Sequence, residues 1–333
     1  PSGEPSAPSG QPTGEPTSSP TTAPTICLPE DRSHCSDNGE CDAAGLACVC
    51  DDPDHRTSAD HCASWTPSAS SDLVTGTGGG VQYGTSSNDE VYSIGVDSSG
   101  DVYTAGHTRG DLYETNSGLM DIWVSKHSGV NGSLIWWAQE GTNEYDRTFA
   151  MDIGHTGDVY TAGFTKGDMY ATKAGSMDIW LSKRSGVNGS LIWGVQYGTN
   201  EDDEIYGVAV DSNDDVYAAG YTTGDLYGSN AGKMDIWVSK RSALNGSLIW
   251  GVQYGTSEDD EAHAIAVDTC GDVYVAGHTD GSLYLSNSGY FDAWMSKRSG
   301  VNGSPIWGVQ YGTNEDEEVF AVAVDSNDDV YAA

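Results

Sequence analysis

Oxygen-bearing side chains that suit a hard cation recur in the second half of the chain. The segments 211–215 and 325–329 both place Asp, Asn and Asp at alternate positions. Carboxylate and amide oxygens are the ligands that Ca²⁺ prefers, but the glycine and distal glutamate of an EF-hand are missing. Asp and Asn also form ordinary turns by bonding their own backbone, so a calcium site and a plain turn are both open. The candidate ligands are Asp211, Asn213, Asp215, Asp325, Asn327 and Asp329.

Four Asn-Gly-Ser sequences could accept N-linked glycans. They begin at Asn131, Asn188, Asn245 and Asn302, and a proline at Pro305 makes the last the least favourable. Asn-Gly is also the preferred dipeptide of a tight hairpin, in which case the serine is incidental. We expect at least one site to be occupied, because other features point to a secreted protein.

Six cysteines within about forty residues predict a disulfide framework, since so short a segment cannot fold on apolar burial alone. Zinc is the alternative, but Cys48 and Cys50 form a C-x-C, and no paired C-x-x-C motifs occur. The cysteines are Cys27, Cys35, Cys41, Cys48, Cys50 and Cys62.

The cysteine spacing, with Asn38-Gly39 before the third cysteine, resembles that of an EGF-like domain. The aromatic-Gly turn usual between the last two cysteines is absent. Thr25-Ile26 stand where calcium-binding members carry acidic residues, so we expect a spacer without its own calcium. The resemblance implies that Cys27 pairs with Cys41, Cys35 with Cys48, and Cys50 with Cys62.

A seventh cysteine, Cys270, stands in a turn at the position that Asn213 holds in another copy of the repeat described below. It should be exposed. An unpaired cysteine in a secreted protein suggests a disulfide to another chain. A free thiol, or a partner elsewhere in a longer chain, is the alternative.

No enzyme motif stands out. The eight histidines show no constellation, and His107 and His278 hold the position of Phe164 and Tyr221, as packing residues would. There is no G-x-S-x-G elbow, phosphate loop or H-E-x-x-H. Two carboxylates could act on a glycosidic bond, but fifty acidic residues in similar copies single out no pair. No cofactor is expected apart from calcium.

These residues are positioned by a repeat of 57 residues. Trp123, Trp180, Trp237 and Trp294 mark it, and no insertion interrupts the register. A fixed period of this kind is typical of repeat architectures. Copies begin near Val81, Ala138, Val195, Val252 and Val309, so four are whole and the fifth is cut short; we expect further blades from a longer chain or another chain.

In the third copy we predict strands over 205–210, 216–221, 235–242 and 248–254, with an Asn-Gly hairpin before the last. Four antiparallel strands per repeat favour a propeller blade in an all-β fold. Its apolar residues do not alternate cleanly, which fits sheets that are buried on both faces. Small residues should lie near the central axis, and Trp237, Trp250 and Tyr254 should fill the wider outer part.

The strings GTNEDDEIYGVAVDSNDDVYAAGYT and MDIWVSKRSALNGSLIWGVQYG resemble the SBBP beta-propeller repeat. The resemblance covers about 73–333 and implies a propeller, typically of about seven blades. It implies no single activity.

Composition divides the chain into four parts. Residues 1–25 form a Pro/Ser/Thr/Gly-rich stalk, extended or disordered, that resembles tracts in surface proteins of stramenopile algae. The EGF-like module spans 26–66, a linker 67–80, and the propeller repeats 81–333.

The formal net charge of -36 argues against a nucleic-acid partner, because phosphates would be repelled. No apolar run is long enough to span a membrane. An acidic surface also fits simple solubility.

The second copy departs most from the others. Trp137, Glu140, Arg147, Asp152 and Gly154 replace residues that the other copies share. A unique site would lie where the symmetry is broken, but neutral drift is the simpler explanation of the differences.

These features predict a non-catalytic, extracellular structural or interaction protein, as a subunit of a cell-surface filament or coat such as a flagellar hair. Its partners would be other copies or other extracellular proteins. A soluble propeller that binds a glycan or protein on its central face is the first alternative, and a polysaccharide-acting enzyme is the second. A polar cluster at the propeller mouth would favour either alternative.

Overall fold

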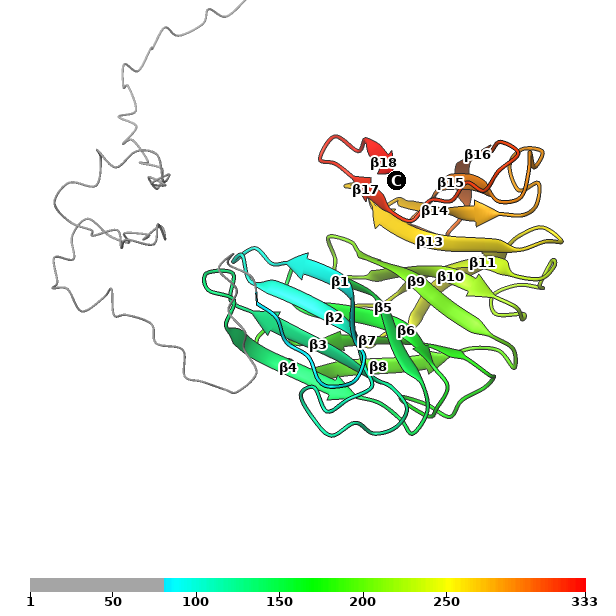
Figure 1. Ribbon diagram of the computed structural model, residues 1–333. Coiled ribbons are helices and arrows are strands. Elements are labelled where there is room, and N and C mark those ends of the chain that lie inside the picture. Colours follow the sequence, from blue (N-terminus) through cyan, green and yellow to red (C-terminus); the bar gives the residue numbers. More distant parts are fainter. Residues whose placement is uncertain (1–80) are drawn as a thin grey trace, which may run out of the picture. The chain divides into compact units, whose positions relative to one another are not determined.

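The computed structural model describes residues 81–333, so the predicted stalk and the six cysteines of the EGF-like module lie outside the described residues. The described part is all-β. Four four-stranded sheets follow one another along the chain, and a two-stranded hairpin comes last (Figure 1). None of the described residues belongs to a helix that could cross a membrane.

Each four-stranded sheet is one copy of the repeat, and its strands pair with their chain neighbours in antiparallel fashion. The four strands predicted for the third copy are confirmed to within two residues at either end. Sequential strands with short connections produce this meander. The first two blades contain β1 (Asp89–Val96), β2 (Val102–Thr108), β3 (Asp121–His127), β4 (Leu134–Glu140), β5 (Asp146–Ile153), β6 (Val159–Thr165), β7 (Asp178–Arg184) and β8 (Leu191–Tyr197).

The last three sheets continue the pattern, and the fifth is represented by its first two strands. They contain β9 (Asp203–Val210), β10 (Val216–Thr222), β11 (Asp235–Arg241), β12 (Leu248–Tyr254), β13 (Asp260–Val267), β14 (Val273–Thr279), β15 (Asp292–Arg298), β16 (Pro305–Tyr311), β17 (Val322–Val324) and β18 (Val330–Ala332).

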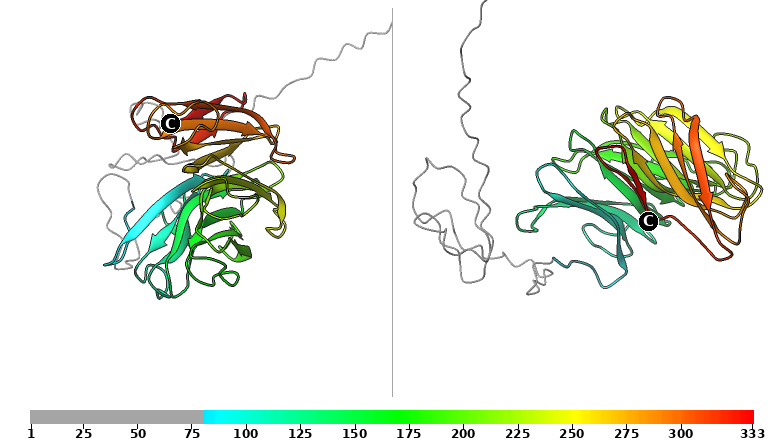
Figure 2. Two further views of the ribbon diagram at one scale, coloured as in Figure 1. Left: turned by 90° about the vertical axis from the view of Figure 1, so that its right-hand side faces the viewer. Right: turned by 90° about the horizontal axis from the view of Figure 1, so that it is seen from above.

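The first strands of neighbouring blades contact one another in the series β1, β5, β9, β13 and β17. They therefore lie innermost, and the later strands of each blade lie progressively farther out. The sheets are arranged as in a propeller but do not close into a ring (Figure 2).

The apolar core lies between successive blades. Trp237 on β11 is fully buried against Leu181 and Trp193 of the preceding blade and Ile205 of its own. Its indole N–H donates to the backbone carbonyl of Glu204 at 3.0 Å. Strands β6, β7, β10 and β14 are buried along their whole length, which confirms that the blades bury both faces.

The Asn-Gly hairpin differs in detail from the tight turn expected. Ser242 donates its backbone N–H to the carbonyl of Ser247, so the connection holds four residues. Only Gly246 has a positive φ, of 70°. A two-residue type I′ turn needs positive φ at both central residues, so the longer loop with one left-handed glycine forms instead.

Candidate binding site on the inner strands

A β-bulge recurs in the first strand of each four-stranded blade. In the third blade the pairing with β10 shifts at Tyr206, which has no partner, while Glu204 pairs with Tyr221. Gly220 lies opposite the bulge, and a Cβ there would come within 2.0 Å of the Glu204 carbonyl oxygen. Bulges re-aim side chains, and this one turns the unpaired aromatic side chain toward the neighbouring inner strands.

The bulged positions form a continuous row of rings across the inner strands, which we call the belt. Equivalent side chains of neighbouring blades approach this closely only near the common axis, where the blades converge. Successive ring centroids are 5.4, 5.2, 5.3 and 5.3 Å apart. The belt consists of Tyr92, Phe149, Tyr206, His263 and Phe320.

Charged residues stand two positions before each belt residue, and we call them the charged row. Four are glutamates, and one, from the second blade, is an arginine. Their charges act on one another, since burial, and after it the charges of Glu204 and Glu318, raises the pKa of the carboxyl between them, Glu261. The row consists of Glu90, Arg147, Glu204, Glu261 and Glu318.

The third blade shows how a buried row carboxylate is satisfied. Glu204 accepts hydrogen bonds from the hydroxyls of Tyr206 and Tyr221, each at 2.9 Å. Glu204 is 8% exposed, and burial raises its pKa despite these bonds. Two tyrosine hydroxyls thus replace the water that the carboxylate has lost.

The fourth blade replaces both tyrosines by histidines. His263 Nε2 lies 3.0 Å from Nδ1 of His278 and 3.6 Å from the Glu261 carboxylate. His278 Nε2 lies 3.9 Å from the same carboxylate. The expectation that the histidines form no constellation is therefore wrong, because these two are fifteen residues apart in sequence but adjacent across the β13–β14 pair.

Electrostatics in this blade favour neutral groups. Burial, then the charges of Glu204, Asp259 and Glu318, raises the pKa of Glu261 to about 7. Burial lowers the pKa of His263 to about 4. Neutral imidazole nitrogens beside a carboxylate are the groups with which proteins hold transition metals.

The first blade has one histidine in this arrangement. His107 is 1% exposed and stacks on Tyr92 at 4.9 Å. Neither ring nitrogen has a hydrogen-bond partner among residues 81–333, although Nε2 lies 3.5 Å from Glu90. His107 and His278 are thus both buried beside the belt, where packing residues are expected. His278 also has polar neighbours, His263 and Glu261.

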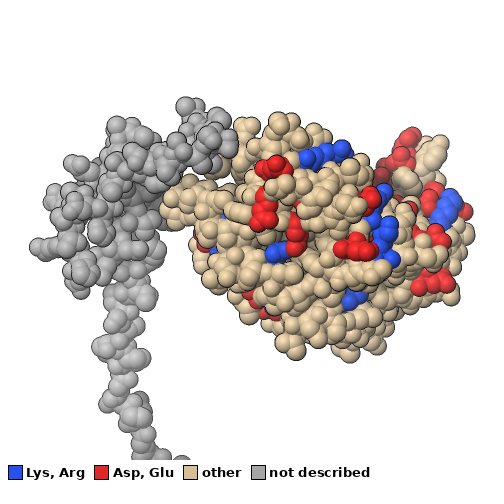
Figure 3. Space-filling model, turned by 90° about the horizontal axis from the view of Figure 1, so that it is seen from below, with Lys and Arg blue, Asp and Glu red and all other residues tan. Residues whose placement is uncertain are grey.

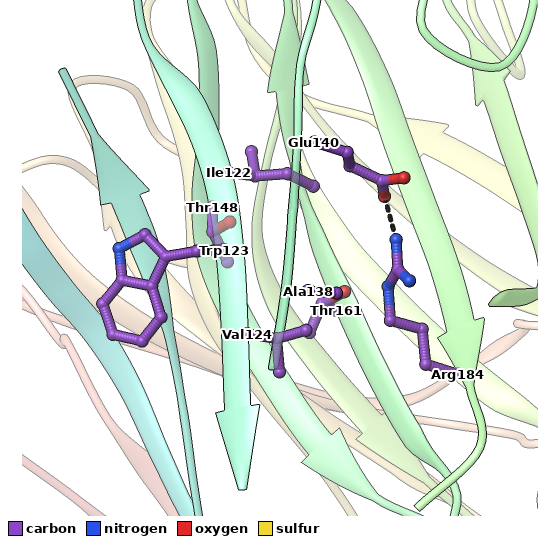
Figure 4. Close-up of a pocket in the computed structure, with 8 residues that line it drawn as sticks. All are labelled: Ile122, Trp123, Val124, Ala138, Glu140, Thr148, Thr161 and Arg184. Atoms are coloured by element: carbon purple, nitrogen blue, oxygen red, sulfur yellow. Dashed lines mark hydrogen bonds and ion pairs between the residues drawn. The ribbon is translucent and has the colours of Figure 1, made fainter. Parts of the chain in front are cut away.

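The residues that set the second copy apart make specific contacts, Glu140 from the end of β4 and the others from the second blade. Arg147 takes the glutamate position in the charged row, with its guanidinium 5.8 Å from the Phe164 ring centre. Glu140 bonds the Arg184 guanidinium (Figure 4). Asp152 accepts the backbone N–H of Val210 at 2.8 Å. The side chains around the Glu140–Arg184 pair leave no room for a water-sized molecule, so no binding cavity forms there.

The predicted calcium ligands have protein partners in the third copy. Asp211 Oδ1 accepts the backbone N–H groups of Asn213 and Asp215, and its Oδ2 lies 2.8 Å from Lys240 Nζ. Asp215 accepts the N–H of Ala243 at 3.0 Å. These contacts form an ordinary Asx turn, while calcium stays an untested prediction.

The fifth copy shows the same turn. Asp325 accepts the backbone N–H groups of Asn327 and Asp329 at 2.9 and 3.0 Å. The two Asp-x-Asn-x-Asp segments therefore fold alike and lie away from the belt.

The predicted modification sites are accessible. All four sequon asparagines, Asn131, Asn188, Asn245 and Asn302, are exposed in the turns after the third strands. Cys270 is exposed in the turn between β13 and β14, as expected from its position.

On the face seen from below, acidic and basic side chains are interspersed in small groups (Figure 3).

The family model described as a beta-propeller repeat, SBBP, matches residues 80–114, 192–228 and 249–284. These three segments carry SBBP beta-propeller repeats. The match covers parts of the first, third and fourth copies and agrees with the four-stranded blades. No curated protein matches the chain at a significant level.

Several solved propellers are similar to these SBBP repeats at low identity. The Dos1 propeller is 8% identical with a TM-score of 0.42, and the alignment covers 74% of this chain and 64% of that one. A gluconolactonase from Xanthomonas campestris is 10% identical (TM-score 0.40; 73% and 68% covered). A luciferin-regenerating enzyme is 11% identical (TM-score 0.38; 73% and 82% covered). The chain thus spans 64% of the Dos1 propeller, and these likenesses concern the fold alone.

Proposed function

We propose that this protein is a non-catalytic, extracellular binding propeller, and that the belt and charged row bind a basic segment of a partner protein. The observation that carries the proposal is the gathering of four glutamates and a single arginine on the inner strands. Burial, then the charges of neighbouring acidic residues, raises the pKa of Glu261, and the repulsion among these carboxylates falls when a cation lies among them. A lysine or arginine side chain supplies such a cation.

The ring faces of the belt are mostly covered by neighbouring rings, which favours a peptide ligand over a glycan. A sugar ring needs a free aromatic face on which to stack. Tyr206 is flanked by Phe149 and His263, with the His263 ring parallel to its own. Only the ends of the belt are open, with Tyr92 and Phe320 46% and 66% exposed.

The exposed sequons and the exposed Cys270 support the extracellular part of the proposal.

Removing row charges should weaken binding of a basic peptide. A fluorescent oligolysine peptide should bind the E90Q/E318Q variant about tenfold more weakly than the wild type, because each lost carboxylate removes a partly desolvated ion pair. Fluorescence anisotropy at physiological salt measures the change.

The matched control is E114Q/E315Q, which removes two exposed glutamates outside the charged row. It should bind like the wild type. An equal loss in both variants would mean that only the overall charge attracts the peptide. Binding of a chito-oligosaccharide, with none of oligolysine, would favour the glycan-binding alternative.

A second candidate function, a subunit of a cell-surface filament, is favoured by the exposed thiol of Cys270. We expect the native protein to run as a disulfide-linked species on a non-reducing gel and to show regular fibres in negative stain. Cys270→Ser should abolish the linked species. A wild-type protein that stays monomeric at all concentrations would speak against the filament.

A further inference from the structure

We propose that Glu261, His263 and His278 form a binding site for a divalent transition metal of the zinc class. All three offer a ligand atom, and these atoms lie within 4.8 Å of one another. Two imidazoles and one carboxylate are a common zinc ligand set, which leaves a fourth position for water or a further ligand. The inference rests on these side chains and does not depend on the proposed peptide binding.

The distances fit a small ion after slight adjustment. Zinc binds nitrogen at about 2.0–2.1 Å, so ligand atoms at the corners of a tetrahedron lie roughly 3.3 Å apart. The observed separations are 3.0 Å between His263 Nε2 and His278 Nδ1, and 3.6 Å between His263 Nε2 and Glu261. All three ligand atoms lie within 4.8 Å of one another, so side-chain rotations that bring these separations to about 3.3 Å would direct them at one ion.

Comparison with the third blade shows what the fourth blade lacks. There the carboxylate of Glu204 accepts hydrogen bonds from Tyr206 and Tyr221. In the fourth blade both hydroxyls are gone, and the imidazoles lie too far from Glu261 for hydrogen bonds. The two facing imidazole nitrogens form a hydrogen bond with each other at 3.0 Å, so among the described residues the group left without a partner is the carboxylate, and a cation among the three groups would bind it together with both nitrogens.

The surroundings hold the two imidazoles in place. The Tyr206 ring stacks on His263 with an interplanar angle of 5°, and Phe320 meets its edge. The Phe291 ring lies 4.4 Å from that of His278, which is only 5% exposed. Packing that fixes ligand rotamers strengthens metal binding, because less freedom is lost when the ion enters.

The ligand types select the metal. Imidazole suits zinc, copper, nickel and cobalt, whereas Ca²⁺ and Mg²⁺ prefer oxygen ligands throughout. This site is therefore distinct in chemistry and in place from the Asp-x-Asn-x-Asp turns.

Titration of the full chain with zinc chloride in a calorimeter tests the proposal. The wild type should bind one equivalent of zinc tightly. The H263Y/H278Y variant should bind its first equivalent about 100-fold more weakly or worse. This variant recreates the Glu-Tyr-Tyr set of the third blade, so its fold has a precedent within the same chain. Background binding elsewhere remains in both proteins and cancels in the comparison.

Glu261→Gln provides a second variant, because it keeps both imidazoles and nearly the same volume. It should also weaken the tight site, and it decides the question if the double variant does not fold. Zinc binding that is equal in all three proteins, or no tight zinc site in the wild type, would overturn the proposal. Tighter binding of Ca²⁺ than of zinc at this site would overturn the assigned metal class.

Discussion

Gly277→Ala should lower the free energy of unfolding by about 3 kcal/mol, the upper part of the range for an overfilled core. An added Cβ would come within 2.0 Å of the Glu261 carbonyl oxygen and 2.9 Å of its carbonyl carbon. Both are backbone atoms and cannot rotate away. The bulge that places His263 in the belt would have to open, so the variant should also lose the tight zinc site. Urea denaturation measures the stability.

Gly228→Ala is the matched control. Its new Cβ would lie 3.5 Å from the Gln253 Cβ, an ordinary contact, and Ala171 occupies the same position in the second copy. We expect a change of no more than about 0.5 kcal/mol, as for most surface substitutions. If the two variants were equally stable, the close approach at the bulge would not be the reason for the glycine.

Acidification from pH 7 to pH 5 should destabilise the wild type relative to His107→Phe by about 2 kcal/mol. Burial, with the nearby charge of Arg147, lowers the pKa of His107 to about 4, against the opposing effect of Glu90. Between about pH 4 and pH 6.5, the ordinary pKa of histidine, the unfolded chain therefore binds a proton that the folded chain does not. Stability conferred by the neutral ring is complete above 6.5 and is lost as the pH falls.

The phenylalanine variant is a suitable reference, because Phe164 fills the equivalent position in the second blade. Thermal unfolding of both proteins at pH 5, 6 and 7 measures the difference. A constant gap between the two midpoints would show that His107 has the same pKa in the folded and unfolded chains, and a gap that moves in the wild type's favour on acidification would show that the ring is protonated when folded.

The blades could be predicted from the sequence because they depend on local and repeated patterns. The segments 205–210 and 248–254 are rich in β-formers, are bounded by turn residues and recur every 57 residues. The hairpin at Asn245-Gly246 was predicted, but its length was not, since the choice between turn types depends on the φ of Asn245 within the folded strand pair.

The belt could not be predicted in the same way. It depends on a bulge that frees Tyr206 from pairing and on contacts between residues 57 apart, such as Tyr206 and His263. Alignment of the copies does show a charged residue two places before an aromatic ring or histidine, a glutamate in four copies and Arg147 in the second. That pattern was a usable signal, whereas the approach of His278 to His263 requires knowledge of the strand register.

The most direct test of the central claim, that the inner strands bind a basic partner segment, is photo-crosslinking of an oligolysine peptide followed by mass spectrometry. The account predicts crosslinks within 90–92, 204–206 and 318–320, where the belt and charged row lie. Crosslinks confined to the acidic loops farther out, such as 111–116 or 225–230, would contradict it and leave the inner strands without a role in binding.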